Sequence, residues 1–297
     1  MTEENKIFII IDSNALIHRA YHALPPLKTK NGELINAVYG FLLVFLKAIK
    51  EFHPEYIAAV FDLKAPTFRH NHFKEYKAKR PKMPDEFYQQ IPIIKDYLKA
   101  FNVPIFEKEG FEADDIIGTI SDLLSKNEKD LEIIILTGDS DMFQLINKNT
   151  KVYAPKKGLK DTLLYDEEKI REKYNLTPDQ LIDFKALKGD ASDNISGVKG
   201  IGEKTAIELI KKFKNLENLY KEIENETEES KEIKERIKEI LIKNKEAAFF
   251  SKMLVEIRKD APIDFKLENC QWKGYNKKNV EELLKNYEFF TLINKLP

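Results

Sequence analysis

One short stretch of the sequence contains five acidic residues at spacings that suit metal binding. These residues are Glu112, Asp114, Asp115, Asp139 and Asp141. The first three open an amphipathic run, and the last two follow the apolar run Glu132 to Leu136. Acids are favoured at a helix N-terminus, which would explain the first three residues, and Asp is common in turns, which would explain the last two. Each of the two groups taken alone therefore has a structural explanation. A metal site is indicated because other apolar runs of the chain also end in an acidic residue.

The elements that must position these acids are strands alternating with helices. Ile7 to Ile11 and Tyr56 to Phe61 are continuous apolar runs, as expected of strands buried on both faces, and Glu132 to Leu136 is a third. Helices are predicted from about Asn14 and over Ala37 to Phe52. This alternation predicts a mainly parallel sheet with helices on both faces.

The predicted sheet should bring acids from distant parts of the chain together. Asp12 and Asp62 end the first two strands, and Asp139 and Asp141 lie just beyond the third. Ligands bind at the carboxyl ends of parallel strands, so these side chains should converge. Converging carboxylates repel one another unless cations neutralise them, and oxygen ligands without His or Cys favour Mg²⁺ or Mn²⁺ over zinc. The alternative is a set of turn acids on a solvated edge.

The segment Thr67 to Gln90 differs in composition from the preceding chain because it is rich in basic and aromatic residues. Its cations are Arg69, Lys74, Lys77, Lys79, Arg80 and Lys82, and its interleaved aromatic residues are Phe68, Phe73 and Tyr76. Cations for phosphates and aromatic faces for bases are what single-stranded nucleic acid requires. A solvated basic helix would have a similar composition.

The chain from about Tyr165 is predicted to be mostly helical. Helices are expected over Asp166 to Tyr174, over Thr177 to Lys188 with Thr177 as N-cap, and over Asn279 to Leu296. Lys221 to Lys245 is interpreted as a solvated helical hairpin.

A glycine-rich hairpin is predicted within Leu187 to Ala206. Its distinctive residues are Gly197, Lys199, Gly200, Gly202 and Lys204. Backbone N–H groups of such a hairpin can face a phosphate, although a turn between helices is the alternative. Asp190 and Asp193 lie just before it and add two acids in a loop.

The composition is that of a globular protein with a core, since 42% of the 297 residues are hydrophobic and 33% are charged. The first six residues lack an apolar signal region, and the run Ala37 to Leu46 is too short to cross a bilayer. Cys270 is the single cysteine, which fits a reducing cytoplasm. The net charge of −1 argues mildly against nucleic-acid binding, but gathering the acids around metal ions leaves a basic remainder.

These features together resemble the 5′-nuclease family, which includes the N-terminal exonuclease domain of bacterial DNA polymerase I, phage exonucleases and flap endonucleases. The matching pieces are Ile11-Asp12, Val60-Phe61-Asp62, Phe68-Arg69, Tyr76-Lys77, Gly110 to Asp115, Thr137 to Asp141, Gly189 to Asn194 and the hairpin Gly197 to Ala206. They occur in collinear order over nearly the whole chain. Ser13 stands where many members have Gly, and no consequence is expected.

The resemblance implies which residues form the site. The divalent-metal ligands would be Asp12, Asp62, Glu112, Asp114, Asp115, Asp139, Asp141, Asp190 and Asp193. Lys77 and Arg80 would act at the scissile phosphate, together with the metal-site residues Asp12 and Asp139. Contacts with DNA would come from Arg19, Arg69, Tyr76, Lys77, Arg80, Gly197, Lys199, Gly200, Gly202, Lys204 and Thr205.

The resemblance also implies a PIN-like 5′-nuclease α/β fold. Residues 1–168 would form the nuclease domain with a basic helical arch at about 67–90. Residues 169–297 would form a helical DNA-binding subdomain with a helix-hairpin-helix at about 187–212. Two Mg²⁺ or Mn²⁺ ions are expected, with K⁺ at the hairpin.

The predicted function is metal-dependent 5′→3′ exonuclease and 5′-flap endonuclease activity on DNA, giving 5′-phosphate products during replication and repair. The chain is expected to be a bacterial cytoplasmic monomer, active at the nucleoid, without a membrane and with a separate DNA polymerase as a partner. A Mg²⁺-dependent phosphatase acting on small molecules is one alternative, but it leaves the basic segment and the hairpin unexplained. A non-catalytic DNA-binding protein is another, but its bare acids would repel DNA.

Overall fold

The computed structural model describes residues 6–156, 158–159 and 161–297. The first five residues, on which part of the expectation about a signal region rests, lie outside this range. Among the described residues no helix is long and apolar enough to cross a membrane.

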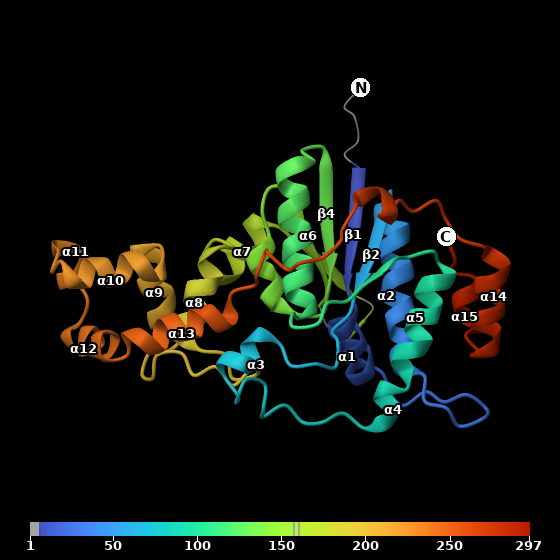
Figure 1. Cartoon of the computed structure of the whole chain (residues 1–297), viewed down its shortest axis with the longest axis horizontal. Helices are drawn as coiled ribbons and strands as arrows, with labels where there is room; N and C mark the ends of the chain where they lie inside the picture. The colour runs from blue at the N-terminus through green and yellow to red at the C-terminus, as the bar shows by residue number, and fades with distance from the viewer. Residues whose placement is uncertain (1–5, 157, 160) are drawn as a thin grey trace.

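A six-stranded sheet in the order β3-β2-β1-β4-β5-β6 forms the centre of the molecule (Figure 1). The strands are β1 (Lys6–Asp12), β2 (Tyr56–Val60), β3 (Ile105–Phe106), β4 (Leu131–Leu136), β5 (Thr150–Pro155) and β6 (Thr162–Tyr165). All neighbouring pairs are parallel except β5 and β6, which are antiparallel. The predicted mainly parallel sheet flanked by helices is therefore confirmed.

Helices cover both faces of the sheet. The helices of the first half are α1 (Ser13–Ala23), α2 (Asn36–Phe52), α3 (Phe68–His72), α4 (Asp85–Tyr88), α5 (Gln90–Ala100), α6 (Ala113–Asn127) and the 3-10 helix η1 (Ser140–Leu145). Those of the second half are α7 (Glu167–Tyr174), α8 (Gln180–Lys188), α9 (Glu203–Phe213), α10 (Leu216–Glu224), α11 (Glu228–Lys231), α12 (Glu235–Lys243), α13 (Lys245–Val255), η2 (Leu267–Cys270), α14 (Lys277–Asn286) and α15 (Phe290–Ile293).

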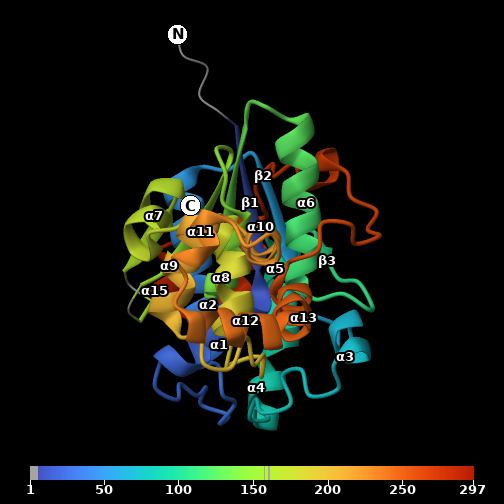
Figure 2. The same cartoon turned by 90° about the vertical axis from the view of Figure 1, so that its left-hand side faces the viewer.

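The alternation of side chains along β1 separates two hydrophobic clusters. Phe8 and Ile10 face a cluster that contains α6 and the buried sides of α8 to α10, whereas Ile9 and Ile11 face a cluster built by α1, α2, α5 and α14. Burial on both faces is why this strand is apolar without interruption. The helices α8 to α13 extend to one side of the sheet (Figures 1 and 2).

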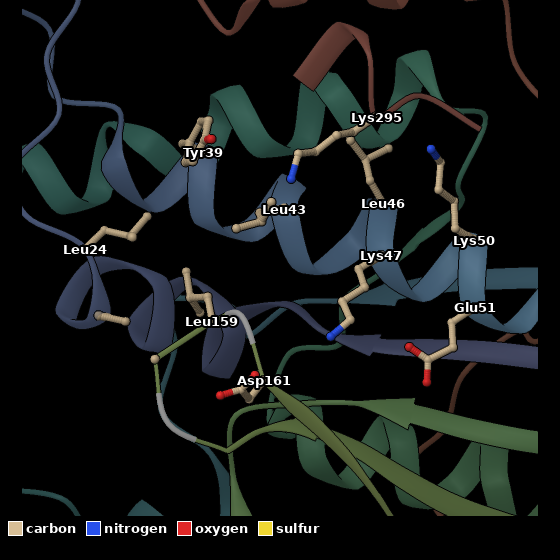
Figure 3. Close-up of a pocket in the computed structure, with 12 residues that line it drawn as sticks. Leu24, Tyr39, Leu43, Leu46, Lys47, Lys50, Glu51, Leu159, Asp161 and Lys295 are labelled. Carbon is tan, nitrogen blue, oxygen red and sulfur yellow. The ribbon is translucent and has the colours of Figure 1, made fainter. Parts of the chain in front are cut away.

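An apolar cleft of about 880 Å³ lies beside α2 and is lined by Leu43, Leu46 and Leu159 (Figure 3). Lys50, Glu51 and Asp161 stand at its rim. It contains none of the acids predicted to bind metal.

Three predictions for the second half need correction. The helix expected from Thr177 begins at Gln180, because the turn before it is closed by i→i+3 hydrogen bonds, from the Gln180 N–H to the Thr177 carbonyl and from the Leu181 N–H to the Pro178 carbonyl. The charged stretch from Lys221 is divided among α10, α11 and α12, and its Leu241 is fully buried. The C-terminal helix is broken into α14 and α15, because Glu288 has φ +59° between them.

The basic segment 67–90 is also less helical than predicted. Only α3 and α4 are helical before α5 begins at Gln90, and residues 73–84 between them form turns and extended backbone. Lys77 lies within this stretch with φ +55°, a conformation that no α-helix contains.

Gly40 in α2 allows α1 and α2 to approach closely. A Cβ atom at this position would lie 2.6 Å from Ala20 Cβ and 2.7 Å from Leu159 Cδ1. We predict that Gly40→Ala lowers the free energy of unfolding by about 1–3 kcal/mol through overpacking. Thermal denaturation should show a lower Tm than for Lys50→Ala, which changes an exposed position of the same helix. An unchanged Tm for Gly40→Ala would show that the helices are not in close contact here.

Candidate active site

The carboxyl edge of the sheet forms an acidic cleft of about 650 Å³, hereafter the acid cleft. The acids that line it are Asp12, Asp62, Glu112, Asp114 and Asp139. They come from the ends of β1, β2 and β4 and from the N-terminal end of α6. The predicted convergence of acids from distant parts of the chain is present in the structure for these residues.

The local structure explains why α6 begins at this edge. Asp62 Oδ1 accepts a hydrogen bond of 2.7 Å from the Ala113 N–H, so the first acid after β2 holds the first residue of the helix. Glu112 is the N-cap and Asp115 the third helical residue of a capping box. The unpaired N–H groups and the dipole of a helix N-terminus favour acids there.

Asp12 is buried between α1 and β4. Its carboxylate accepts hydrogen bonds from the Ala15 N–H (3.2 Å) and from Thr137 Oγ1 (2.5 Å). Burial raises the pKa of Asp12 to about 7, and the nearby Asp139 and Asp62 add to the rise while the Thr137 hydrogen bond opposes it. Carboxylates held this close resist ionisation together unless a cation is added.

The pKa of Asp114 is raised for the same reasons as that of Asp12. Burial raises its pKa well above the usual value, and the charges of Asp12 and Asp139 raise it further. Lys77 opposes this shift. The cleft therefore has a shortage of positive charge close to its buried acids.

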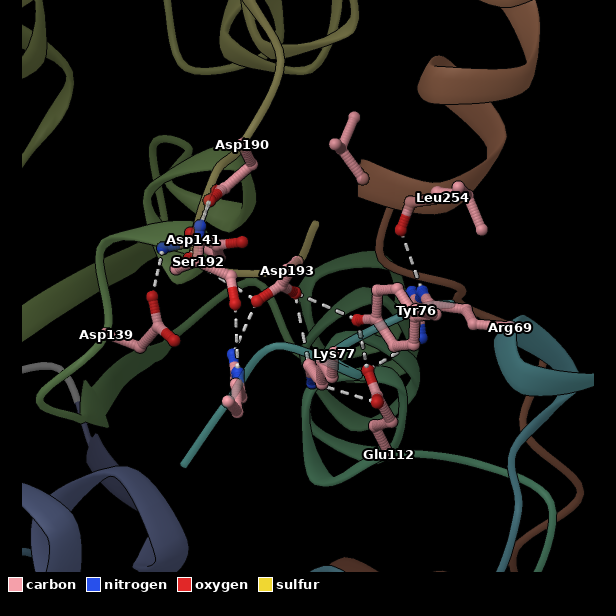
Figure 4. A network of polar contacts seen from close by, with 12 residues as sticks. Arg69, Tyr76, Lys77, Glu112, Asp139, Asp141, Asp190, Ser192, Asp193 and Leu254 are labelled. Carbon is pink, nitrogen blue, oxygen red and sulfur yellow. Dashed lines mark hydrogen bonds and ion pairs between the residues drawn. The ribbon is translucent and has the colours of Figure 1, made fainter. Parts of the chain in front are cut away.

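Three cations of the basic segment, Lys77, Arg80 and Lys82, line the acid cleft. Lys77 Nζ lies 2.9 Å from Glu112 Oε1 (Figure 4). Arg80 Nη2 lies 2.5 Å from Asp193 Oδ1. Burial opposes ionisation of Glu112, but Lys77 and Arg69 outweigh it and lower the pKa of this carboxyl. The structure thus places both predicted catalytic cations against predicted metal ligands.

Asp141 and Asp190 form a separate group around Lys185 of α8. Lys185 Nζ contacts Asp141 Oδ1 and lies 3.0 Å from Asp190 Oδ2. Burial raises the pKa of Asp141 to about 7, with Asp139 adding to the rise and Lys185 opposing it. Burial works against ionisation of Asp190, yet Lys185 and the Ser192 hydrogen bonds lower its pKa to about 2.

The sequence analysis missed Lys185. A lysine five residues before Asp190 on a predicted helix can reach the acids of the following loop, but the sequence around Lys185 does not distinguish it from Lys188 of the same helix.

Arg69 and Asp115 form a buried pair, which corrects their predicted roles. The exposed fractions of their side chains are 2% and 0%. Arg69 donates to both oxygens of Asp115 (2.8 and 2.9 Å), to Glu112 Oε2 (3.2 Å) and to two backbone carbonyls (2.8 and 2.7 Å). This uses all five donors of a guanidinium, so Arg69 faces protein and has no N–H left for DNA.

The carboxylate of Asp115 is equally occupied. Besides Arg69 it accepts hydrogen bonds from the N–H groups of Glu112 (3.1 Å) and Arg258 (2.9 Å). Asp115 therefore orders the start of α6 and lies apart from the acids that line the cleft.

Tyr76 is also buried, although an exposed ring was predicted to contact DNA. Its exposed fraction is 3%, and its hydroxyl lies 3.0 Å from both Glu112 Oε2 and Asp193 Oδ2. Burial of the ring against the protein prevents a base from stacking on it in this conformation.

Arg19 lines the acid cleft, as a contact with the cleaved strand would require. Its Nη2 donates to the Lys156 carbonyl (3.0 Å), while its buried Nε has no hydrogen-bond partner within the described parts of the chain. Lys156 lies next to a residue of which the structure gives no description.

The glycine hairpin precedes α9. Lys199, Gly200, Gly202 and Lys204 are exposed, and Thr205 is half-buried. Gly197 is different because it is buried: a Cβ there would lie 2.3 Å from the Gly189 nitrogen. Gly197 therefore permits close packing of two backbone segments, and the open end of the hairpin lies at Gly200 to Lys204.

As arranged, the described residues contain no group of three or more acids, histidines or cysteines ready to hold one metal ion. Lys77, Arg80 and Lys185 are bonded to the side-chain oxygens of Glu112, Asp193, Asp141 and Asp190.

Two family models account for most of the chain. The 5′-3′ exonuclease N-terminal resolvase-like domain matches residues 7–175, and the 5′-3′ exonuclease C-terminal SAM fold matches residues 176–278. The chain belongs to the 5′-3′ exonuclease family.

Relatives and solved structures agree with this assignment. DNA polymerase I of Bacillus subtilis is 41% identical over 297 residues, which are 100% of this chain and 33% of that protein. DNA polymerase I of Caldicellulosiruptor bescii is 41% identical over 97% of this chain and likewise 33% of its own length. The chain thus spans about a third of the length of these relatives.

The fold is shared with more distant nucleases. The T5 D15 protein crystallised with metal ions has a TM-score of 0.69 at 20% identity, covering 94% of this chain and 99% of the other. The catalytic core of Rad2 in complex with a DNA substrate has a TM-score of 0.57 at 22% identity, covering 99% and 93%. At such identities the likeness shows the fold.

The raised pKa of Asp12 predicts how stability changes with pH in the absence of divalent ions. The pKa of Asp12 is about 7 in the folded state and near 3.8 when the chain is unfolded. The contribution of the protonated Asp12 carboxyl to the free energy of unfolding is therefore fully present below pH 3.8 and is lost as the pH rises to 7. In EDTA, Asp12→Asn should therefore gain Tm relative to the wild type between pH 4 and pH 7. A constant difference over this range would show that Asp12 does not have a raised pKa.

Proposed function

We propose that this chain is a divalent-metal-dependent 5′→3′ exonuclease and 5′-flap endonuclease that hydrolyses phosphodiester bonds of DNA. The observation that carries the proposal is one cleft lined both by Asp12, Asp62, Asp114 and Asp139 and by the cations of the basic segment. Membership of the 5′-3′ exonuclease family supports the same activity.

The residues of the cleft suit Mg²⁺ or Mn²⁺. Their donors are carboxylate oxygens, and the buried Asp12 and Asp114 lack the positive charge that would let them ionise together. Asp12, Asp62, Asp114 and Asp139 would hold ions in the acid cleft, and Asp141, Asp190 and Asp193 would do so on its α8 side. When bound, divalent ions would activate the attacking water and stabilise the leaving oxygen.

The protein's own cations would then be free to act on the substrate. Glu112 and Asp193 hold Lys77 and Arg80 at the wall of the cleft. A phosphate entering the cleft would attract both side chains, and they would balance the charge that develops in the transition state. Arg19, which also lines the cleft, would hold the same strand.

DNA would be selected by its shape. The exposed N–H groups and lysines from Lys199 to Lys204, with Thr205 beside them, would bind the duplex backbone at the N-terminal end of α9, with K⁺ as a further ligand there. Five residues of the stretch 73–84 line the acid cleft, namely Lys77, Arg80, Pro81, Lys82 and Met83, and this stretch would guide the single strand.

The remaining expectations are part of the same proposal. The reaction would leave 5′-phosphate ends during replication and repair in the bacterial cytoplasm, at the nucleoid. The division into residues 1–168 and 169–297, a monomeric state and a DNA polymerase as partner are also proposed.

Purified protein should cut a labelled 5′-flap substrate in Mg²⁺ and not in EDTA. Asp139→Ala should abolish cleavage and leave flap binding intact, because the carboxylate lines the acid cleft. Asp122→Ala, which removes the same charge from an ion pair on the exposed side of α6, should retain wild-type cleavage. Full activity of Asp139→Ala would exclude the metal assignment.

Lys77→Ala should lower kcat by roughly 10²–10³-fold, the cost of removing a positioned charge from a transition state. Binding of the flap should fall much less. Lys79→Ala is the matched control, because it removes the same charge from an exposed position of the same turn. If both variants lost only affinity, Lys77 would have no role in the transition state.

A further inference from the structure

A segment from the second half of the chain crosses the elements that hold the acid cleft. It comprises residues Leu254–Ala261, hereafter the strap, which leaves the C-terminal end of α13. In Figure 1 the chain leaving α13 passes in front of the lower part of α6.

The strap is hydrogen-bonded to three elements that carry acids or cations of the site. Arg69 of the basic segment donates to the carbonyls of Leu254 (2.8 Å) and Glu256 (2.7 Å). On α6, Asp115 accepts from the Arg258 N–H (2.9 Å), and Thr119 accepts from the Ala261 N–H (2.9 Å).

The third element is η1, which follows Asp139 and contains Asp141. Its Gln144 donates from Nε2 to the Val255 carbonyl (3.1 Å) and accepts at Oε1 from the Ile257 N–H (2.9 Å). The side chain is buried, with an exposed fraction of 8% for the residue. One amide therefore satisfies two backbone groups of the strap, and within the described residues it forms no hydrogen bond with an acid.

The sequence of α6 permits this close contact. A Cβ on Gly118 would lie 2.6 Å from Ile257 Cγ2 and 2.7 Å from the Arg258 carbonyl oxygen. Any larger side chain at this position would have to push the strap outward, so Gly118 fixes its distance from the helix.

The other end of the strap is fixed to the helices near the hairpin. Lys252 of α13 forms a part-buried ion pair of 2.7 Å with Asp183 of α8. Lys185 and Asp190 follow on α8 and in its adjoining loop. The strap thus joins the helical half of the chain to the edges that carry Glu112, Asp114, Asp139 and Asp141.

We propose that Gln144 is a positioning residue for the nuclease reaction, which holds the Asp139–Asp141 turn in register with α6 by bonding to the strap. This inference rests on the proposed function. Gln144 touches no substrate in this arrangement, so its effect is on the geometry of the acids and not on binding of DNA.

The test uses Gln144→Met, which keeps the shape of the side chain and removes both hydrogen bonds. Gln180→Met is the matched control. The Gln180 amide likewise bridges backbone groups, accepting from Thr177 and donating to Ile210 and Lys214, but it lies at the far ends of α8 and α9 from the acids. The measurements are Tm, Mn²⁺ affinity without DNA, and kcat and KM on a 5′-flap substrate.

Both variants should lose Tm, and Gln144→Met should lose more, because its hydrogen bonds are buried whereas those of Gln180 are part-buried or exposed. Gln144→Met should also weaken Mn²⁺ binding by roughly 10–100-fold, the usual effect of losing a group that orients metal ligands, and lower kcat at least tenfold with KM within about twofold. Gln180→Met should leave Mn²⁺ affinity and kcat at the wild-type level. Wild-type Mn²⁺ affinity and kcat in Gln144→Met would overturn the proposal.

Gly118→Ala is the second variant, because it displaces the strap while every hydrogen-bonding group remains. Like Gln144→Met, it should weaken Mn²⁺ binding and lower kcat with little change in KM. If Gln144→Met does not fold, Gly118→Ala tests whether the strap positions the acids. The results that would refute the two proposals are different. If the wild-type protein binds Mn²⁺ and does not cut the flap, the proposed function is refuted. The Mn²⁺ affinities of the variants would then still test whether Gln144 and the strap position the metal-binding acids.

Discussion

Repulsion among carboxylates at one edge of the sheet is the constraint on which the rest of the structure depends. Asp12, Asp114 and Asp139 come from β1, α6 and the end of β4. Asp139 raises the pKa of both Asp12 and Asp114, and Asp12 also raises the pKa of Asp114. The fold can hold such a group only by supplying hydrogen-bond donors and positive charge close by.

The protein supplies positive charge to the neighbouring acids from two elements, the basic segment and α8. Lys77 and Arg80 come from the basic segment and Lys185 comes from α8, and each is bonded to acids predicted to bind metal. Arg69 acts differently, because it is buried and neutralises Asp115 permanently. The first three cations are part-exposed, so divalent ions can compete with them for the same oxygens. An ammonium or guanidinium released in this way remains beside the cleft, where a phosphate would be bound.

The sequence was sufficient for the sheet and for the edge where the acids meet. Ile7 to Ile11 is β-branched and apolar without a break, and only a strand buried on both faces explains that pattern. An aspartate directly after such a strand has little freedom, so the positions of Asp12 and Asp62 follow from the strands before them.

The remaining features depend on contacts that no local pattern contains. Arg69 lies in a basic run and is expected to be solvated, but its partners at Leu254 and Glu256 are more than 180 residues away. Tyr76 is buried for the same kind of reason, because Asp193 reaches it from the other half of the chain. The break between α14 and α15 depends on one residue, Glu288, in a left-handed conformation that its amino-acid type does not predict.

A crystal structure of the protein grown with Mn²⁺ tests the central claim most directly, since anomalous scattering locates the ion without reference to the protein. The account predicts a peak bonded to oxygens of Asp12, Asp114 or Asp139, with Lys77 moved away from Glu112. A map with no peak in the acid cleft, and with Lys77 still paired to Glu112 at saturating Mn²⁺, would contradict it.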